Sequence, residues 1–302
     1  MKLSNQPMST LLSNYKMQDK LEYVNCDLCN NNETTLLFTK DDYKHVKCNS
    51  CGLIYVNPRL RHSKDNLDNF YASDEDPEGL IKSLLHRAYS ARRQKIFCAE
   101  LKKMERYRKL NRILDIGCSF GGFLYTAKNL GWRAKGIEAV YDVGKHGKEQ
   151  YNLDIFFGTL EEAKLEPASF DVIRLNNIIE HIPLPSQFLA DVNKLLRKGG
   201  LLSVSTPNFD SYSVSICGKE WIYFDGQHHI VLFTRATLEK ILDKNGFTTV
   251  LLSTKGFHIR VKDNVSHNLA KETLLKLSEK AISQFVRFTR KGHRLKIWAE
   301  KR

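Results

Sequence analysis

The chain has 302 residues, of which 42% are hydrophobic, so it can form one large domain with a core and a small additional module. No apolar run approaches the roughly 18 residues of a membrane-spanning helix, and residues 1–20 lack the apolar segment of a signal peptide, so we expect a cytoplasmic protein. Seven cysteines, an odd number, favour a reducing compartment over a disulfide framework. The net charge of +13 is concentrated at 81–112 and 240–302, which indicates an anionic partner or solvated helix faces.

Two Cys-x-x-Cys pairs near the N-terminus predict a metal site. Eighteen residues separate the two pairs, which are Cys26 with Cys29 and Cys48 with Cys51. Four thiolates at this spacing close a tetrahedral zinc site and leave no position open for water, so we expect a structural zinc ion. The alternative, four unrelated buried cysteines, does not explain the regular pairing, and neither pair opens a helix as a redox motif does. Residues 34–46 are rich in β-formers and are expected to supply a hairpin between the pairs.

The stretch that follows the cysteines is predicted to be mainly helical. A short helix over 63–71 and an acidic linker over 73–79 precede one long basic helix over 80–110. The apolar stripe of this long helix is formed by Leu84, Ala88, Ala91 and Ile96. The helix leads directly into the strand around which the rest of the chain is organised.

Residues 112–123 predict the start of a nucleotide-binding α/β unit. A buried strand is followed by a turn that contains Gly117, Gly121 and Gly122, and then by a helix. Glycines let a ligand approach the backbone and the first N–H groups of the helix. Asp115 in this turn would repel a pyrophosphate but attract an ammonium or a sulfonium, and the glycine spacing differs from that of dinucleotide binders. The turn therefore favours a cationic adenosine ligand, with a glycine turn that binds nothing as the alternative.

The next strand, 134–137, ends at Glu138, whose two carboxylate oxygens suit the two hydroxyls of a ribose. Further strands are predicted at 154–157, 170–175, 201–205, 247–253 and 295–299, and helices at 142–151, 185–197 and 235–245. Strands that alternate with helices imply a parallel sheet, and ligands of such sheets lie at the carboxyl ends of the strands. The polar residues at these ends are Asp115, Glu138, Thr159 and Asn176.

Two later stretches do not follow this alternation. Residues 208–233 form a long connection with Asp225, His228 and His229, and we expect this aromatic loop to line an acceptor pocket. Residues 265–289 are predicted to form a basic amphipathic helix whose apolar face contains Leu274, Leu277 and Phe285. We expect that face to pack against the sheet, and peripheral contact with anionic lipid is the alternative use of this helix.

With these residues in view, the chain resembles a class I S-adenosylmethionine-dependent methyltransferase. The matching motifs are Ile113-Leu-Asp-Ile-Gly-Cys118 with Gly121, then Glu138, Phe170-Asp-Val-Ile with Glu180-His-Ile-Pro183, and Leu196-Arg-Lys-Gly-Gly-Leu-Leu202. The resemblance implies an α/β fold with a doubly wound, seven-stranded, mostly parallel sheet in the order 3-2-1-4-5-7-6, the last strand being antiparallel. It also implies a cofactor site, in which Asp115 and Gly117 hold the methionine end, Glu138 the ribose, and Thr159 and Leu160 the adenine edge. Ser119, Gly121 and Asn176 complete the expected cofactor residues.

A closer resemblance is to bacterial methyltransferases that begin with a four-cysteine zinc ribbon. These proteins carry Cys-Gly-Leu-Ile-Tyr-Val-Asn-Pro after the ribbon, here residues 51–58, and a late His-x-x-x-Phe-Thr, here residues 229–234. Such proteins often belong to surface-polysaccharide or sugar-modification pathways. The chain departs from the wider pattern where Ser119 replaces the usual middle glycine of the turn and where residues 158–159 lack the common acid at the adenine.

The motifs and the resemblance together predict how the chain is divided. The expected parts are a polar N-terminal extension (1–22), the zinc ribbon (23–60), a helical linker or lid (61–109) and the methyltransferase domain (110–302), with a basic helical insertion over 264–291 before the last strand.

An acceptor hydroxyl must lose its proton during methyl transfer, and three histidines are candidates for the base. We favour His229, which follows Asp225 in the aromatic loop, with His228 next; His181 serves equally well as a structural cap of the site. The favoured function is methylation of a sugar hydroxyl on a small molecule or glycan, with N- and C-methylation left open. One alternative is an RNA methyltransferase that uses the ribbon and the basic patches, although nucleic acid is the less favoured partner. A further alternative is a non-catalytic module that binds S-adenosylmethionine.

Overall fold

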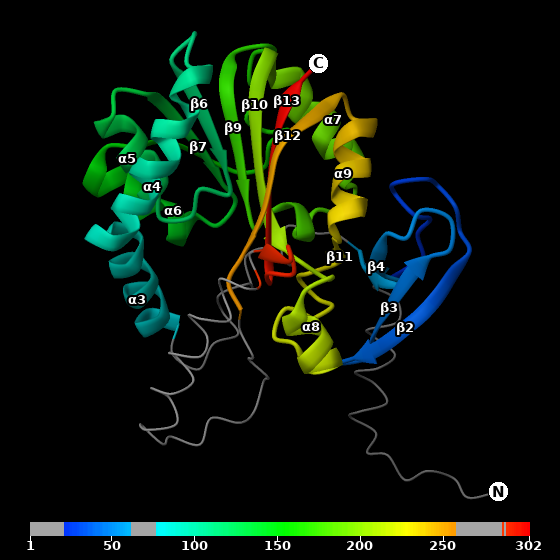
Figure 1. Cartoon of the computed structure of the whole chain (residues 1–302). Helices are drawn as coiled ribbons and strands as arrows, with labels where there is room; N and C mark the ends of the chain where they lie inside the picture. The colour runs from blue at the N-terminus through cyan, green and yellow to red at the C-terminus, as the bar shows by residue number, and fades with distance from the viewer. Residues whose placement is uncertain (1–20, 62–76, 258–285, 287) are drawn as a thin grey trace, which may run out of the picture.

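The computed structural model describes residues 21–61, 77–257, 286 and 288–302, and a seven-stranded sheet lies at its centre (Figure 1). The sheet has the order β12-β13-β10-β9-β6-β7-β8. The strands are β6 (Arg112–Ile116), β7 (Arg133–Glu138), β8 (Asp154–Phe157), β9 (Phe170–Asn176), β10 (Leu196–Pro207), β12 (Phe247–Lys255) and β13 (Arg294–Lys301). Neighbours from β8 to β10 are parallel, whereas β13 is antiparallel to both β10 and β12. The predicted fold class and strand order are thereby confirmed.

Helices cover both faces of this sheet. Figure 1 shows α4, α5 and α6 on one face and α7 and α9 on the other. The helices are α3 (Pro77–Tyr89), α4 (Ala91–Met104), α5 (Gly122–Asn129), α6 (Tyr141–Tyr151), α7 (Pro185–Leu195), α8 (Tyr212–Cys217) and α9 (Arg235–Lys244), with short 3₁₀ turns η1 (Glu105–Tyr107), η2 (Ile179–His181) and η3 (Gly218–Glu220). Thr234 caps α9, since its hydroxyl accepts a hydrogen bond from the backbone N–H of Thr237.

The central strands are apolar on both faces because both faces are covered. Successive side chains of a strand point to opposite sides. On β6, Ile113 packs with Phe97 of α4, while its neighbour Leu114 belongs to the cluster that contains Leu189 of α7 and Leu238 of α9. This two-sided burial explains why β6 and β9 read as continuous apolar runs rather than alternating ones.

The long helix predicted over 80–110 is wrong, because the chain breaks at Ser90. The Ser90 hydroxyl accepts from the backbone N–H of Arg93 and starts α4 as a new helix. The break changes the helical phase, so the predicted stripe does not continue. Ile96 is 48% exposed, and Phe97, Leu101 and Met104 are buried instead. The acidic linker also ends earlier than predicted, since α3 begins at Pro77.

A second boundary differs at 185–200. The helix α7 ends at Leu195 and not at 197, and the glycine pair Gly199-Gly200 that follows lies inside β10. Gly199 has φ +66°, and the register of β10 against β9 shifts between Leu196 and Leu201, so the pair forms a bulge. Arg197 donates from Nε to the Asp171 carboxylate at 2.6 Å, which holds this bulge against the sheet.

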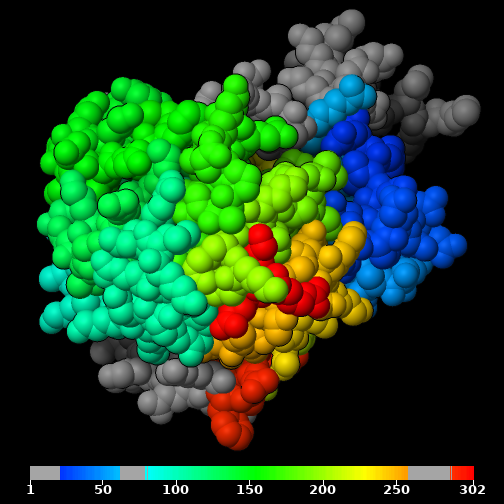
Figure 2. Space-filling model, turned by 90° about the horizontal axis from the view of Figure 1, so that it is seen from above, coloured from blue at the N-terminus to red at the C-terminus, as the bar shows by residue number. Residues whose placement is uncertain are grey.

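The N-terminal ribbon forms a small sheet that includes a strand from much later in the chain. The ribbon as a whole contains the strands β1 (Leu21–Glu22), β2 (Thr34–Lys40), β3 (Tyr43–Cys48), β4 (Ile54–Val56) and β5 (Arg59–Leu60), of which β1 and β5 pair with each other. The hairpin predicted for 34–46 is the β2–β3 pair. The four-stranded sheet has the order β11-β4-β3-β2, in which β11 (Val231–Leu232) lies near the end of the predicted acceptor loop, 208–233. Figure 2 shows the ribbon, in blue, packed beside the orange segment of α9 and β12.

Several predicted segments lie outside the described residues. These are the extension before residue 21, the helix over 63–71 and almost all of the basic helix over 265–289, which stay predictions. Among the helices that are described, each is too short or too polar to cross a lipid bilayer.

Candidate active site

A cavity of about 1600 Å³ lies at the carboxyl ends of β6, β7, β8 and β9. Ligand pockets for one small molecule typically measure about 300–1,000 Å³, so this cavity has room for a cofactor and an acceptor. All but one of the predicted cofactor residues line it, namely Asp115, Gly117, Ser119, Glu138, Thr159, Leu160 and Asn176. The exception is Gly121, the N-cap of α5, where a Cβ would lie 2.5 Å from Leu153. The three predicted histidines, His181, His228 and His229, line the same cavity.

The glycine turn follows the end of β6 and lies close to the cavity. The backbone N–H groups of Gly117 and Cys118 donate to the Ile137 carbonyl at 2.8 and 3.1 Å, which anchors the turn on β7. Gly117 has φ +69°, and a Cβ there would lie 1.9 Å from the Ile178 side chain, so only glycine fits. Ser119 also has a left-handed φ of +51°, and its N–H donates to Glu138 Oε2 at 2.7 Å. That hydrogen bond helps to hold a conformation that serine rarely adopts.

Glu138 is held in one orientation at the end of β7. Its Oε2 accepts from Ser119 N–H, and its Oε1 accepts from Val140 N–H at 3.0 Å. Burial raises the pKa of this carboxyl against the effect of these N–H donors. Each carboxylate oxygen has a second lone pair. Two adjacent hydroxyls of a ligand can therefore bind here without rearrangement of Glu138.

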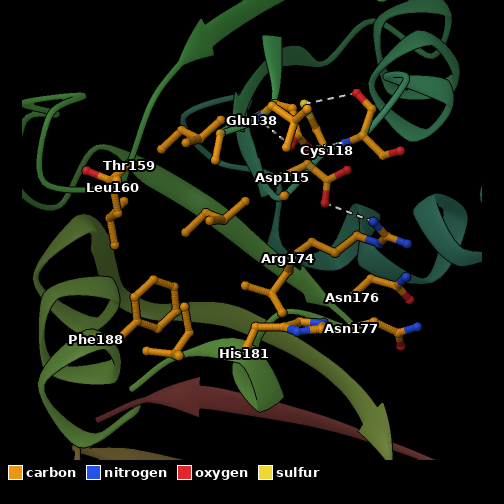
Figure 3. A pocket seen from close by; sticks show the side chains of 18 of the residues that line it. Asp115, Cys118, Glu138, Thr159, Leu160, Arg174, Asn176, Asn177, His181 and Phe188 are labelled. Carbon is orange, nitrogen blue, oxygen red and sulfur yellow. Dashed lines mark hydrogen bonds and ion pairs between the residues drawn. The ribbon is translucent and has the colours of Figure 1, made fainter. Parts of the chain in front are cut away.

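Asp115 is paired with a cation that the sequence analysis did not identify. Its Oδ1 accepts from Arg174 Nη1 at 2.8 Å, as the dashed line in Figure 3 shows. Its Oδ2 is buried without a hydrogen-bond partner among the described residues. Burial raises the pKa of Asp115 to about 6, although Arg174 acts in the opposite direction. The signal in the sequence was the single arginine within the apolar strand β9.

A second cation, Arg93 of α4, lines the same end of the cavity. Its guanidinium lies over the Phe97 ring, 4.9 Å from the centroid. Burial lowers the pKa of Arg93, and the neighbouring charges of Arg174 and Arg294 lower it further. No ion pair joins Arg93 to a carboxylate of the described residues. Arg93 was not identified from the sequence, because residues 80–110 were predicted to form one helix with a different buried face.

At the other end of the cavity, Asp225 gathers the histidine pair. Its Oδ1 accepts from the backbone N–H groups of His228 and His229, each at 2.9 Å. Its Oδ2 lies 3.3 Å from His228 Nδ1 and 3.4 Å from His229 Nδ1. Burial would raise the pKa of Asp225, but the two histidines hold it well below its usual range. At His229 burial acts to lower the pKa, but the carboxylates of Asp225 and Glu180 outweigh burial and raise it.

The pKa of His181 is shifted in the opposite direction to that of His229. Its Nδ1 lies 3.0 Å from the His228 carbonyl oxygen, so Nδ1 carries the proton and Nε2 is the unprotonated nitrogen. Burial lowers the pKa of His181 to about 3, which makes the ring neutral at pH 7. The His181 and His229 rings are 4.8 Å apart, and Glu180 also has a side-chain oxygen within 4.8 Å of ring nitrogens of both. The three groups therefore form one cluster of titratable side chains at this end of the cavity.

The four cysteines of the ribbon converge on one point. Cys26 Sγ lies 3.3 Å from Cys51 Sγ, Cys29 Sγ lies 3.5 Å from Cys48 Sγ, and all four sulfurs are within 4.8 Å of one another. A tetrahedral zinc site with Zn–S bonds of about 2.3 Å places its sulfurs about 3.8 Å apart, so the cluster fits a zinc ion. Burial raises the pKa of Cys26, whereas at Cys29 the Asn31 N–H and the other thiols outweigh burial and lower the pKa to about 7.

A model of the methyltransferase domain family matches residues 84–252, which include the glycine turn, Glu138 and the histidine pair. The chain belongs to the methyltransferase domain family. By family and fold it is an S-adenosylmethionine-dependent methyltransferase. The matched residues begin after the four-cysteine ribbon, so the ribbon is an addition to the family's domain in this chain.

Relatives and solved structures agree with this family. The chain is 33% identical over 119 residues to the ubiquinone biosynthesis O-methyltransferase of Maricaulis maris, covering 37% of this chain and 47% of the relative. It is 29% identical over 161 residues to the enzyme of that name from Coxiella burnetii, covering 50% and 68%. The chain thus spans about half of the length of the first relative and about two thirds of the second. A phosphoethanolamine N-methyltransferase 2 of Haemonchus contortus, in complex with phosphomonomethylethanolamine and S-adenosylhomocysteine, shares the fold with a TM-score of 0.55 at 18% identity, covering 82% of this chain and 62% of that one.

Proposed function

We propose that this methyltransferase transfers a methyl group from S-adenosylmethionine to a hydroxyl oxygen of a small molecule or glycan. The observation that carries the proposal is the pair of His229 and His181, which lines the same cavity as the glycine turn, together with Asp225 beside His229. A hydroxyl needs a base when it is methylated, and an imidazole oriented by a carboxylate supplies one. The printed names of two relatives, both O-methyltransferases, support oxygen as the acceptor atom.

The chain's own residues fit the methionine end of the cofactor, which carries an ammonium and a carboxylate. Asp115 offers its unpartnered Oδ2 to the ammonium, and Arg93 offers a cation to the carboxylate. Gly117 lets the turn pack against Ile178 and keeps its backbone at the edge of the cavity. Glu138 then accepts from the ribose hydroxyls, and Leu160 contacts the adenine edge.

S-adenosylmethionine supplies a methyl group that its sulfonium already activates. The residues around the acceptor must align the hydroxyl, exclude water and take its proton. We assign the proton to His229, and Asp225 then stabilises the imidazolium that forms. His181 is neutral and orients the loop through its hydrogen bond to the His228 carbonyl. When the methyl passes to oxygen, the bond from sulfur to carbon breaks and the proton stays on His229.

We further propose that the four cysteines hold a structural zinc ion and that the acceptor is a sugar hydroxyl in surface-polysaccharide or related biosynthesis. Sulfur distances of 3.3 and 3.5 Å support the metal. The ribbon, followed by Cys-Gly-Leu-Ile-Tyr-Val-Asn-Pro, supports the sugar pathway through the resemblance described above. Methylation of RNA is the alternative that the basic patches keep open.

Mass spectrometry with deuteriomethyl-labelled S-adenosylmethionine tests the proposal. Purified enzyme is incubated separately with nucleotide sugars, with cell-surface glycans from a strain that lacks the protein, with catechols and with total RNA. We expect label on oxygen of the glycan or sugar samples and none on RNA. Label on RNA alone, or on nitrogen or carbon, would contradict the assignment of a hydroxyl acceptor.

A further inference from the structure

We propose that the four-cysteine ribbon positions the catalytic histidines, and that Tyr43 of its hairpin is the positioning residue. The histidine loop is defined here as residues 221–230, which contain Asp225, His228 and His229. The inference rests on the proposed function, in which His229 is the base. It assigns to the ribbon a role at the acceptor end of the cavity and none at the cofactor end.

The histidine loop runs directly into β11, which is a strand of the ribbon sheet. Val231 pairs with Tyr55 and Leu232 with Ile54 in the β11–β4 ladder. The N–H of Val56 donates to the Ile230 carbonyl at 2.9 Å, one residue after His229. Because β4 follows directly on the second cysteine pair, the register of the ribbon determines where the loop ends.

The beginning of the loop is attached to the tip of the β2–β3 hairpin. Buried Lys40 donates from Nζ to the Trp221 carbonyl at 3.1 Å. His45 stacks on Phe38 with ring centroids 4.4 Å apart, and Phe38 lies 4.9 Å from Phe224 of the loop. Among the residues that the structure describes, neither nitrogen of His45 has a hydrogen-bond partner, and burial lowers its pKa to about 4. His45 therefore acts as a neutral aromatic spacer between hairpin and loop.

Tyr43 contacts the loop at the residue after Asp225. Gly226 has φ +62°, and a Cβ at this glycine would lie 2.4 Å from Tyr43 Cβ and 2.6 Å from its Cγ. The backbone of the loop thus lies against both the Cβ and the ring of Tyr43. Burial raises the pKa of Tyr43, and the nearby charge of Asp225 raises it further. Removal of the ring would free the segment that orients both histidines.

The opposite end of the ribbon is fastened to the body. Ser186 N–H donates to Asp27 Oδ2 at 2.6 Å, and Lys244 donates from Nζ to the Leu28 carbonyl at 2.9 Å. Lys240 donates to the Cys51 carbonyl at 3.3 Å. The ribbon therefore connects α7 and α9 to the histidine loop through the cysteine cluster. The glycine turn is anchored on β7 instead, so a loosened ribbon should leave it in place.

Fluorescence of Trp221 tests the inference without a known acceptor. The chain has three tryptophans, and Trp132→Phe with Trp298→Phe leaves only the one in the loop, which is 1% exposed. In this background, Tyr43→Ala and removal of the ribbon metal by a chelator should both shift Trp221 emission to longer wavelength. Calorimetric affinity for S-adenosylhomocysteine should change by less than about twofold, because distant sites behave independently.

Three variants control this experiment. Tyr43→Phe should behave as wild type, since the contact is made by the ring and not by the hydroxyl. Tyr23→Ala should also behave as wild type, because Tyr23 belongs to the ribbon but is 80% exposed. Gly226→Ala, which would place a Cβ 2.4 Å from Tyr43 Cβ, should also shift Trp221 emission, because the loop must move away from the hairpin. A second readout is the pKa of the His229 ring, measured by NMR. This ring faces Asp225, His228, Glu180 and His181, and its pKa should fall in Tyr43→Ala as Asp225 moves away.

The outcomes separate the two proposals. Trp221 emission and a His229 pKa that are unchanged in Tyr43→Ala would overturn the positioning role. Loss of S-adenosylhomocysteine binding in Tyr43→Ala, with retention in Tyr23→Ala, would also overturn it, since the effect would not be confined to the acceptor end. Failure of the wild-type protein to bind S-adenosylhomocysteine would count against the proposed function, while the emission comparison would still decide whether the ribbon positions the loop.

Discussion

The two ends of the cavity are built in different ways. The cofactor end uses residues at the ends of β6, β7 and β8, which follow one another within residues 112–160. The acceptor end brings together η2, the histidine loop and the ribbon hairpin, and one of its hydrogen bonds joins residues 181 positions apart. The glycine turn and the two carboxylates of the cofactor end therefore lie close together in the chain, although Arg93 and Arg174 reach this end from α4 and β9. The acceptor end, by contrast, exists only in the folded protein.

Because the two ends are built differently, cofactor affinity and transfer rate should depend on different parts of the chain. A strand followed by a glycine turn positions Asp115 and Glu138 whatever surrounds them. The histidines depend on contacts with a ribbon that lies outside the residues matched by the family model. Changes at the cofactor end should alter affinity for the cofactor, and changes at the acceptor end should alter the transfer rate.

Loss of the ribbon metal is the largest effect that we predict. Wild-type protein should contain one zinc ion per chain, and Cys48→Ser with Cys51→Ser should contain none, because two thiolates cannot close the site. Much of the folding free energy of a small metal module comes from its metal, so the ribbon should loosen before the main sheet. Metal analysis measures this, with Cys98→Ser of α4 as the control. Wild-type protein without zinc, or a double variant that keeps it, would refute the site.

Replacement of the base should have the next largest effect. His229→Ala should lower the transfer rate on the identified acceptor by roughly 10²–10⁴-fold, the usual scale for loss of a general base. Its affinity for S-adenosylhomocysteine should stay near that of wild type. Single-turnover kinetics and calorimetry check the two statements, with exposed His86→Ala as the matched control. Full activity of His229→Ala between pH 6 and pH 9 would move the role to His228.

The opposite pattern is predicted at the cofactor end. Glu138→Ala should weaken cofactor binding by about 1.5–3 kcal/mol, the range for hydrogen bonds to a charged group. Glu149→Ala removes an exposed acid from the neighbouring helix and should have no effect. Calorimetry with S-adenosylhomocysteine is the measurement. Unchanged affinity in Glu138→Ala would exclude this residue as the ribose acceptor.

Cofactor affinity should also depend on pH through Asp115. Its pKa is raised from 3.8 to about 6, so the folded protein holds this proton to a higher pH than the unfolded chain does. The buried charge accordingly lowers stability as pH rises from about 4 to 6, while it improves attraction for the ligand ammonium. We expect affinity to fall by up to about tenfold per pH unit below pH 6 and to level off above it. Asp115→Asn should bind more weakly and show no such dependence; a wild-type affinity that is constant from pH 5 to pH 8 would contradict this.

The smallest effect concerns the serine in the glycine turn. Ser119→Gly relieves a left-handed backbone but adds freedom to the unfolded chain, and these contributions, each about 1 kcal/mol, oppose each other. Stability should change by less than about 1 kcal/mol, and cofactor affinity should not change, since only the backbone N–H of residue 119 binds Glu138. Thermal denaturation and calorimetry measure both. A large gain in affinity would show that the serine side chain obstructs the ligand.

What could be predicted from the sequence follows the same division. The position of Asp115 and Glu138 in the cavity was accessible, because each lies at the end of a short strand with a strong pattern. The strand order was accessible only through the resemblance to the family. Arg93 was missed, because a one-residue break at Ser90 changed which face of the helix is buried. Arg174 was missed because a cation inside an apolar strand gives no sign of the carboxylate that it meets.

The acceptor end was predicted only in part for a related reason. The three histidines were identified, but the sequence does not show that β11 completes the ribbon sheet or that Tyr43 touches Gly226. These contacts join segments about 180 residues apart, and no local pattern encodes them. The raised pKa of His229 is also a tertiary effect, since it arises from Glu180 together with Asp225.

A crystal structure of the enzyme with S-adenosylhomocysteine is the most direct test of which end of the cavity binds the cofactor. We expect the ligand ammonium within hydrogen-bond distance of Asp115 Oδ2, the carboxylate at Arg93 and the ribose hydroxyls on Glu138. We also expect the ligand sulfur to face the end of the cavity where His229 and His181 lie. An adenosine bound away from Glu138, or a sulfur turned away from the histidines, would contradict the assignment of the two ends.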